Sequence, residues 1–498
     1  MEFQLDDSLL FKGFLNEKLF NNKINKLNNP NASDIVAKEG LELIIRPECN
    51  QKCDYCYIGQ YGDKLYPYQE RANNSQILNN LKMFLNYLIK EESYIVHWEI
   101  FAGDLFYDDL YFDLMDVFYN YYFNKLHEMN KIIPCQVRPR IVMPCNFSFC
   151  ESKEQLEKIE KIIDKFENIN VELGFSWSHD GKYAIDTREK REISEEFYDN
   201  AFNFVKKHRA GIHAMISAEN IENAIENFDW WVSAYNKYLP DYDIVAPYFL
   251  EVRNGGEYWT DEKIDKYLEF LNHVMNKMFN LCDRDPKKYC WSVYSERYSD
   301  RKKEYYKKYY PHIKIAQDFT EIIHMLKNPD AMSCTHGHAL CLNIGNLTFN
   351  PCHRLTYKQF QGGCFKVNQT ELFKTNNQYL DSVVTTKEIV DIEAKDGLNG
   401  YLNSFFTVRN NFAGCNFCEY NGLCIKGCLG AQFEHYGDPN YPIPSVCKLY
   451  KSKIDFIFKK YKEFDALNFL IFSEESPLSE FKQEKFKEFL DLKGWYNE

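Results

Sequence analysis

The sequence lacks an apolar run of the roughly 18–20 residues that a membrane-spanning helix needs. Residues 1–20 mix Asp, Lys and Phe and contain no apolar core of the kind found in signal peptides. A basic excess is also missing, since the formal net charge is −13, and this disfavours nonspecific binding to a nucleic-acid backbone. The net charge does not exclude nucleic-acid binding at a local basic patch. There are also no internal repeats or low-complexity tracts. Without a membrane span or a signal-peptide core, we expect a cytoplasmic protein.

Cysteine, in contrast, is abundant, with 17 residues in 498. In a reducing compartment, many cysteines indicate metal or redox chemistry rather than a disulfide framework. The odd number also excludes complete internal pairing.

Short runs rich in β-branched and aromatic residues alternate with longer segments of helical periodicity between residues 41 and 280. The predicted strands are Leu41–Arg46, Tyr94–Phe101, Arg140–Pro144, Asn170–Trp177, Gly211–Ser217 and Asp243–Leu250. Serial strand–helix units predict an α/β fold, a partial (β/α)6 TIM-type barrel with parallel strands. In such barrels the chemistry lies at the carboxyl ends of the strands.

The rest of the chain divides by composition. We expect an N-terminal extension over residues 1–40 and the barrel over residues 41–280. A polar, Tyr-rich stretch at residues 281–333 predicts a bridging helical insertion. Residues 334–447 hold nine of the cysteines, as in a small domain organised by metal, and residues 448–498 predict C-terminal helices.

The first cysteine group follows the first predicted strand, with Cys49, Cys53 and Cys56 on one loop. Three thiolate ligands would leave one iron of a four-iron cluster open, as a substrate-binding metal requires. A structural zinc site without a visible fourth ligand, or three unrelated cysteines, are the alternatives.

This CxxxCxxC segment resembles the signature of the radical S-adenosylmethionine (SAM) superfamily, including the aromatic residue, here Tyr55, before the third cysteine. The resemblance implies a [4Fe-4S] cluster whose open iron chelates the amino and carboxylate groups of S-adenosylmethionine. One-electron cleavage then gives a 5′-deoxyadenosyl radical that abstracts a substrate hydrogen. The cofactor carries the chemistry and the protein supplies binding and orientation.

After the second strand the family carries a Gly-Gly-Glu motif that binds the methionine amino group. Here the corresponding segment is Phe101-Ala102-Gly103-Asp104, in which Ala replaces a Gly and Asp replaces Glu. The resemblance implies cofactor contacts from Gly103 and Asp104, with a carboxylate one methylene shorter than usual.

Two further strand ends match the family less closely. Asn146 lies where relatives often have Thr-Asn-Gly, and Ser178 opens a segment that resembles a Ser-x-Asp-Gly motif. In relatives, the Ser and a later Arg hold the ribose and the carboxylate of the cofactor. Arg188 is the predicted counterpart, with Arg191 as its competitor, and solvated loop residues are the alternative at each position.

The C-terminal cysteines resemble those of the SPASM domain, a module of radical enzymes that modify peptides and proteins. By the ligand arrangement of the family, the nearer [4Fe-4S] cluster would be held by Cys334, Cys341, Cys352 and Cys428. The outer [4Fe-4S] cluster would be held by Cys415, Cys418, Cys424 and Cys447. Six residues separate Gly345 from Cys352, where four is usual, and a hairpin would accommodate the difference. A tetrahedral zinc site remains the alternative for the C-x2-C-x5-C-x3-C run.

Six cysteines fall outside these sets, and we expect them to be buried free thiols. They are Cys135, Cys145, Cys150, Cys282, Cys290 and Cys364.

The two resemblances together imply S-adenosylmethionine and three [4Fe-4S] clusters in an enzyme that acts on a peptide or protein. We favour maturation of a ribosomally made peptide by crosslinking, oxidation or epimerisation. Oxidation of a Ser or Cys in a sulfatase is the first alternative, and a small-molecule radical dehydrogenase is the second. A non-enzymatic interaction protein held together by zinc is the least favoured.

Relatives of the sulfatase-maturing type carry an Asp directly after the cysteine that corresponds to Cys352, and here His353 takes this place. Oxidation of an alcohol or thiol requires a base, so His353 is the predicted proton acceptor. A structural hydrogen bond is its alternative role. An electron donor such as flavodoxin or ferredoxin is an expected partner. Only 48 residues precede Cys49, so a leader peptide would be captured by a separate protein or by residues 281–333, unless no leader exists.

Overall fold

The computed structural model describes about three fifths of the chain, and its gaps include residues 1–40, 285–339 and 365–413. The described residues are 41–66, 71–90, 95, 97–101, 103–129, 138–184, 187–188, 192–242, 246–284, 340–350, 352–357, 363–364, 414–421, 423–424, 427–459, 472 and 480–496. The predicted N-terminal extension, and the predicted insertion beyond residue 284, therefore lie outside the described residues. Within the described part, no helix is both long and apolar enough to cross a membrane.

The described residues belong to two compact units. Unit 1 comprises residues 1–178, 192–212 and 335–410, and unit 2 comprises residues 179–191, 213–334 and 411–498. Helix α18 (Pro444–Lys459) continues through the predicted boundary between residues 447 and 448.

Five parallel strands form the centre of unit 1, in the order β4-β3-β2-β1-β7. Their bounds are β1 (Leu41–Ile44), β2 (His97–Phe101), β3 (Arg140–Cys145), β4 (Glu172–Ser178) and β7 (Leu340–Asn343). Two short antiparallel strands, β8 (Thr348–Asn350) and β9 (Gly363–Cys364), follow β7. The β7–β8 pair is a hairpin that contains Gly345.

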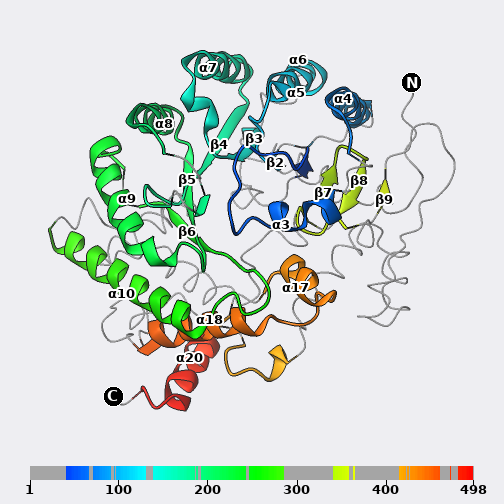
Figure 1. The fold of residues 1–498 in the computed structure, drawn as a ribbon. Helices are drawn as coiled ribbons and strands as arrows, with labels where there is room; N and C mark the ends of the chain where they lie inside the picture. Colours follow the sequence, from blue (N-terminus) through cyan, green and yellow to red (C-terminus); the bar gives the residue numbers. More distant parts are fainter. Residues whose placement is uncertain are drawn as a thin grey trace. The chain divides into compact units, whose positions relative to one another are not determined.

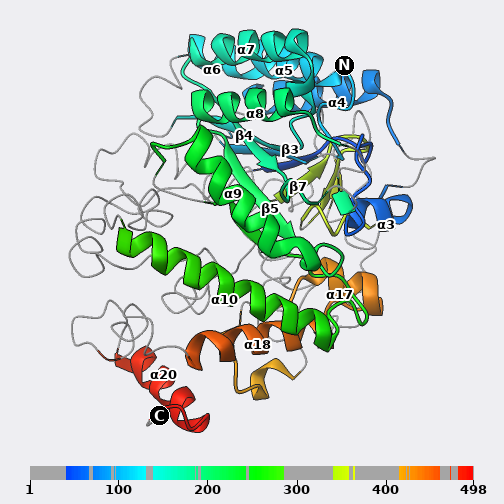
Figure 2. The same cartoon turned by 60° about the vertical axis from the view of Figure 1, so that its left-hand side comes forward.

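Helices α4 (Asn74–Lys90), α5 (Leu110–Phe118), α6 (Asn124–Glu128), α7 (Lys153–Glu167) and α8 (Glu195–His208) lie along one face of β1–β4 (Figures 1 and 2). The other helices of unit 1 are α3 (Tyr57–Leu65), the π-helix η2 (Tyr119–Phe123) and the 3-10 helix η3 (Ser148–Glu151).

The alternation of side chains along β2 fixes which face is which. Trp98 is fully buried, with its ring 6.3 Å from that of Phe84 in α4 and 5.2 Å from that of Phe118 in α5. The outward face of the strand thus packs on the helices. His97, Glu99 and Phe101 alternate with it and point to the opposite, inner face.

Unit 2 contains the parallel pair of β6 (Tyr248–Glu251) and β5 (Gly211–Ile216), the latter beginning within unit 1. Its helices are η5 (Ile221–Asn223), α9 (Ala224–Tyr238), α10 (Asp261–Arg284), η7 (Cys415–Phe417), α17 (Leu429–Tyr436), α18 and α20 (Glu480–Leu492). Helices α10 and α18 lie side by side in both views (Figures 1 and 2). All six predicted strands are present and are parallel wherever they pair, which confirms the predicted α/β class, and the cysteine-rich C-terminal part is present too.

Candidate iron–sulfur and cofactor site

The three cysteines of the first group lie on the loop that leaves the carboxyl end of β1. Cys49, Cys53 and Cys56 are each partly exposed, and the loop closes through a 3.1 Å hydrogen bond from the Cys56 amide to the Cys53 carbonyl. Cys56 is the N-cap of α3, so the third thiol lies at a helix N-terminus, which favours negative charge. The loop therefore presents three accessible thiols at the strand end that the sequence predicted.

This loop rests directly on the end of β2. The Gly103 amide donates to the Arg46 carbonyl at 2.9 Å, and the Asp104 amide donates to the Glu48 carbonyl at 2.7 Å. A Cβ atom on Gly103 would lie 2.1 Å from the Pro47 oxygen and 2.2 Å from the Glu48 oxygen. Only glycine allows this close approach, so Gly103 fixes the backbone on which the three thiols stand.

Asp104 ties the end of β2 to the segment after β3. Its carboxylate accepts hydrogen bonds from the Phe106 amide at 3.2 Å and from the Ser148 hydroxyl at 3.1 Å. Asn146 connects the same segment to the cysteine loop, because its amide donates to Asn50 Oδ1 at 2.6 Å. Three strand ends are thus joined through side chains at the cysteine loop.

Burial dominates the electrostatics of Asp104, whose residue is 1% exposed. Burial raises the pKa of the carboxyl, while the donors Phe106, Ser148 and Asn146 and the charge of Arg46 act in the opposite direction. Arg46 itself makes two 2.7 Å bonds to Asp108 and lowers the pKa of that carboxyl to about 2. The predicted contact from Asp104 to a cofactor ammonium stays a prediction.

The remaining predicted cofactor contacts are dispersed. Tyr55 is buried in the cysteine loop, and Ser178 is the half-buried last residue of β4. In unit 2, buried Arg188 pairs with Asp180, at 3.2 Å. Arg191 lies outside the described residues, so its competition with Arg188 stays open.

His353 lies on the inner side of unit 1. Its Nδ1 is 3.2 Å from Glu42 Oε2 on β1, and its ring stacks on Phe101 of β2 with centroids 4.0 Å apart. The side chain of Glu42 is 2% exposed, whereas that of His353 is 30% exposed. Glu42 and Phe101 therefore hold the imidazole in one orientation and leave part of it accessible.

A second carboxylate, Glu99, lies beside this pair, directly opposite Glu42 in the strand register. Burial and the charge of Glu42 raise the pKa of Glu99 to about 7, while His353 and Arg140 lower it. The inner face of the strands therefore contains a carboxyl group, that of Glu99, whose pKa lies near neutral pH.

The predicted ligands of the nearer cluster are only partly described. Cys341 on β7 and Cys352 after β8 are both buried in unit 1, and burial, Glu42 and the Cys352 thiol raise the pKa of Cys341. Cys428 belongs to unit 2, and Cys334 lies outside the described residues. Cys341 and Cys352 are near enough to affect each other, as two ligands of one cluster must be.

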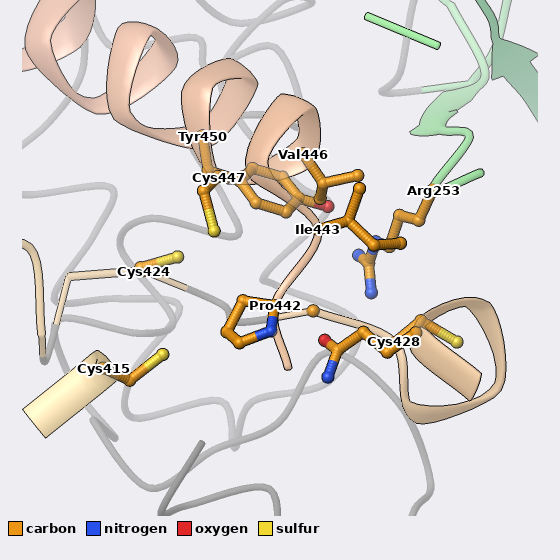
Figure 3. A pocket seen from close by; sticks show the side chains of 11 residues that line it. Arg253, Cys415, Cys424, Cys428, Pro442, Ile443, Val446, Cys447 and Tyr450 are labelled. Carbon is orange, nitrogen blue, oxygen red and sulfur yellow. The ribbon is translucent and has the colours of Figure 1, made fainter. Parts of the chain in front are cut away.

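The four predicted ligands of the outer cluster gather in unit 2. Burial, followed by the neighbouring thiols Cys424, Cys415 and Cys418, raises the pKa of Cys447 to about 12, while Lys451 opposes the rise. Cys415, Cys424 and Cys447 line a cavity with about 350 Å³ of space not filled by atoms, part of it open to solvent. In Figure 3 the sulfurs of these three lie on one side of Pro442 and Cys428 lies on the other.

This donor set fits a bound cluster. Burial and the neighbouring thiols raise the pKa of Cys447, and metal binding deprotonates such a thiol. No group of three or more His, Cys, Asp or Glu among the described residues forms a site for a metal ion as the side chains lie. A four-iron cluster spreads its thiolates further apart than one zinc ion does.

Two of the cysteines outside the sets, Cys145 and Cys150, have described side chains, and both are buried. Cys145 is 6% and Cys150 0% exposed, and burial raises the pKa of both thiols. For these two, the prediction of buried free thiols is confirmed.

Several residues that lie beside the predicted site residues were missed in the sequence analysis. Asn50 and Ser148 lie next to predicted residues and could have been found as polar residues at strand ends. Glu42 had a different signal, a lone acid inside an apolar strand. Arg253 carried none, because only folding brings it to the cysteine cavity.

No family model matches the chain, and no curated protein does. Among solved structures, native anSMEcpe with bound AdoMet is 14% identical, with a TM-score of 0.48, over 86% of this chain and 99% of that chain. SuiB of Streptococcus suis bound to precursor peptide SuiA is 16% identical, with a TM-score of 0.42, over 82% and 76%. SuiB bound to S-adenosylmethionine is 14% identical, with a TM-score of 0.41, over 82% and 78%.

Proposed function

We propose that this chain is a radical S-adenosylmethionine enzyme that modifies a residue of a peptide or protein. The observation that carries the proposal is the loop of Cys49, Cys53 and Cys56, which presents three partly exposed thiols at the carboxyl end of a parallel strand. Three ligands suit a four-iron cluster that keeps one iron open for a substrate or cofactor. When bound, this cluster and S-adenosylmethionine supply a 5′-deoxyadenosyl radical on one-electron reduction.

The residues around the loop have the task of orientation. Gly103 brings the end of β2 against the loop backbone, and Asp104, Asn146 and Ser148 link the neighbouring strand ends. These bonds hold the loop rigidly, and rigidity limits misplacement of a reacting group. Asp104 is the proposed contact to the cofactor ammonium, and Tyr55, Ser178 and Asn146 are further proposed contacts from unit 1. Arg188 is the proposed contact to the cofactor carboxylate.

The second group of thiols supports an auxiliary role. The outer site offers four neighbouring thiols, Cys415, Cys418, Cys424 and Cys447, which would close the coordination of a second four-iron cluster. Cys341 and Cys352 would hold the nearer cluster together with Cys334 and Cys428. Fully ligated clusters suit electron transfer, and an external one-electron donor of the flavodoxin or ferredoxin type would complete the system.

His353 is the proposed proton acceptor for an oxidation. Glu42 fixes its Nδ1 and Phe101 its ring plane, so the accessible part of the imidazole has a defined direction. A carboxylate partner of this kind selects the tautomer and leaves Nε2 able to accept a proton. The presence of a titratable side chain directly after Cys352 favours oxidation of a Ser or Cys in a protein as the second candidate reaction.

The test of the proposal separates radical formation from turnover. Anaerobically reconstituted and reduced protein should cleave S-adenosylmethionine to 5′-deoxyadenosine, and changing Cys49, Cys53 and Cys56 together to Ala should abolish cleavage. A triple variant that still forms 5′-deoxyadenosine contradicts the assignment.

The substrate class is tested with peptides encoded beside the gene. The right peptide should accelerate cleavage and either lose hydrogen, as in oxidation or crosslinking, or take up solvent deuterium, as in epimerisation. Turnover of a sugar alcohol with no reaction of any peptide contradicts the peptide proposal and leaves the radical chemistry standing.

A further inference from the structure

The four outer thiols come from two different parts of unit 2. Three of them, those of Cys415, Cys418 and Cys424, lie on short turns. The fourth, that of Cys447, lies in the first turn of α18. Figure 3 shows its sulfur pointing from this helix toward Cys424. The place of the fourth thiol therefore depends on what holds α18.

The segment that follows β6 holds the start of this helix. Ser445, two residues before Cys447, donates from its hydroxyl to the Gly256 carbonyl at 2.7 Å. Further along the helix, the central carbon of the Arg253 guanidinium lies 5.6 Å from the centroid of the Tyr450 ring. Both contacts come from one short segment of unit 2, so the start of α18 is tied to the end of β6.

A buried ion pair fixes α18 beyond these contacts. Lys453 pairs with Glu251, the last residue of β6, and their side chains are 3% and 2% exposed. Tyr267 of α10 donates to the same oxygen of Glu251, Oε1, at 2.5 Å. Helices α10 and α18 lie side by side (Figure 2). One carboxylate thus ties α18 to a strand and to a helix at once.

Glu251 keeps its charge mainly through Lys453. Burial acts to raise the pKa of this carboxyl, but Lys453, followed by Tyr267 and Arg253, lowers the pKa overall. The second oxygen, Oε2, is buried and has no hydrogen-bond partner among the described residues. Removing one partner of a buried ion pair is far more costly than removing both charges. Loss of the lysine alone should therefore displace α18, because a displaced helix lets water reach Glu251.

We propose that Glu251 and Lys453 are positioning residues for the outer cluster, because they hold α18 on β6 and so hold Cys447 in place. This inference rests on the proposed function. A thiol on an anchored helix has its place before any iron binds, and a preorganised group binds without a cost of ordering. The ion pair thereby fixes one ligand of the outer cluster, to which the three thiols on turns are then joined.

The test combines hydrogen–deuterium exchange with electron paramagnetic resonance. In protein without iron, Lys453→Met should increase the exchange of the α18 amides. After reconstitution it should remove most of the outer-cluster signal, which is identified by its absence in Cys447→Ser. The first cluster, recognised by its response to S-adenosylmethionine, should keep its signal. The double variant Glu251→Gln with Lys453→Met removes both charges and keeps an acceptor for Tyr267, so it should restore the protection of α18 and the outer signal.

The matched control is Lys485→Met in α20, because Lys485 is 57% exposed and its pair with Glu488 contributes little to stability. It should change neither measurement. An intact outer signal in folded Lys453→Met overturns the inference. Equal loss of all clusters also overturns it, since the pair would then support the fold as a whole. A double variant without the outer signal overturns it too, by assigning the effect to the charge of Lys453.

If Lys453→Met does not fold, Tyr267→Phe decides, because it removes only the hydrogen bond to Glu251. Increased exchange of α18 with faster loss of outer-cluster iron to a chelator supports the inference, and unchanged values overturn it. Failure of the proposed function would look different. The parent protein would then give no iron–sulfur signals, while the exchange of α18 would still respond to Lys453→Met.

Discussion

The two described thiol sites are built in different ways. The loop of Cys49, Cys53 and Cys56 is an extension of the parallel sheet, since its backbone is bonded to the end of β2 through Gly103 and Asp104. The outer thiols stand on short turns, with bonds such as the Cys418 amide to the Cys415 carbonyl at 3.1 Å, and on one helix.

This difference indicates which of the two thiol sites needs a bound metal to keep its structure. A sheet buries its own core and can present a loop without help, and Trp98 of β2 packs on two helices to do so. Turns with few buried apolar residues gain little from folding, and burial with neighbouring thiols raises the pKa of Cys447, which a bound metal would reverse. The first site should therefore be preorganised, whereas the outer site should need its cluster to hold its shape.

The largest expected effect separates the sites directly. Removing all iron by chelation under oxidising conditions should free the backbone amides of residues 414–428, while β1–β4 keep their protection. Hydrogen–deuterium exchange with mass spectrometry measures both regions in one sample. Equal protection of residues 414–428 with and without iron would contradict the comparison.

The next effect tests the preorganised loop. Gly103→Ala places a Cβ within 2.2 Å of two backbone oxygens, so the loop must move and S-adenosylmethionine cleavage should fall by about 10²-fold or more. Gly62→Ala in α3 is the matched control, because its Cβ would meet nothing closer than 3.8 Å. The control should cleave normally and gain up to about 1 kcal/mol of stability. Normal cleavage in Gly103→Ala would show that the loop needs no such fit.

A change beyond the cysteines tests the inner face. His353→Ala should still cleave S-adenosylmethionine and abstract substrate hydrogen, but product should fall by about 10²-fold, the contribution of a general base. Glu42→Gln is the companion variant, since it keeps the shape and loses the carboxylate that fixes Nδ1. It should lie between the parent and His353→Ala. Unaltered product from His353→Ala would assign the histidine a structural role and make Glu99 the next candidate.

The smallest expected effect concerns Asp104. Asp104→Ala should weaken S-adenosylmethionine binding by about 1.5–3 kcal/mol, as for a hydrogen bond to a charged group. Asp104→Asn keeps the size of the side chain and an acceptor for the Phe106 amide, so it tests the effect of the negative charge alone. Isothermal titration calorimetry gives the affinity and thermal unfolding gives the stability. A fall in melting temperature with unchanged affinity would make Asp104 purely a link between strand ends.

The strands were predictable because each has a recognisable local sequence pattern. The alternation of β2 and β3 and the turn residues around them depend on a few neighbouring residues, and the structure has all six strands within a few positions of the predicted ones. Strand β7 was missed because its pairing depends on β8 and on β1, which is remote in the sequence. The π-helix Tyr119–Phe123 has no local signature of this kind.

The cysteines of the site were predictable from spacing alone, but their surroundings were not. Asp104 was expected to face a cofactor, and the sequence gives no sign that Phe106 and Ser148 already bond to it. Glu42 and His353 are 311 positions apart, and only the packing of the loop after β8 against β1 and β2 brings them together. Arg253 meets the cysteine cavity for the same reason, through tertiary contacts that no motif encodes.

The central claim is that the first thiol group holds a cluster with an open iron. The other two thiol groups are predicted to hold fully ligated clusters. Iron and sulfide analysis, combined with electron paramagnetic resonance of the reduced protein with and without S-adenosylmethionine, tests the claim most directly. We predict three four-iron clusters, one of which changes its signal when S-adenosylmethionine is added, and a Cys49, Cys53 and Cys56 triple variant with two clusters and no such response. Zinc in place of iron, or an S-adenosylmethionine response that survives in the triple variant, would contradict the account.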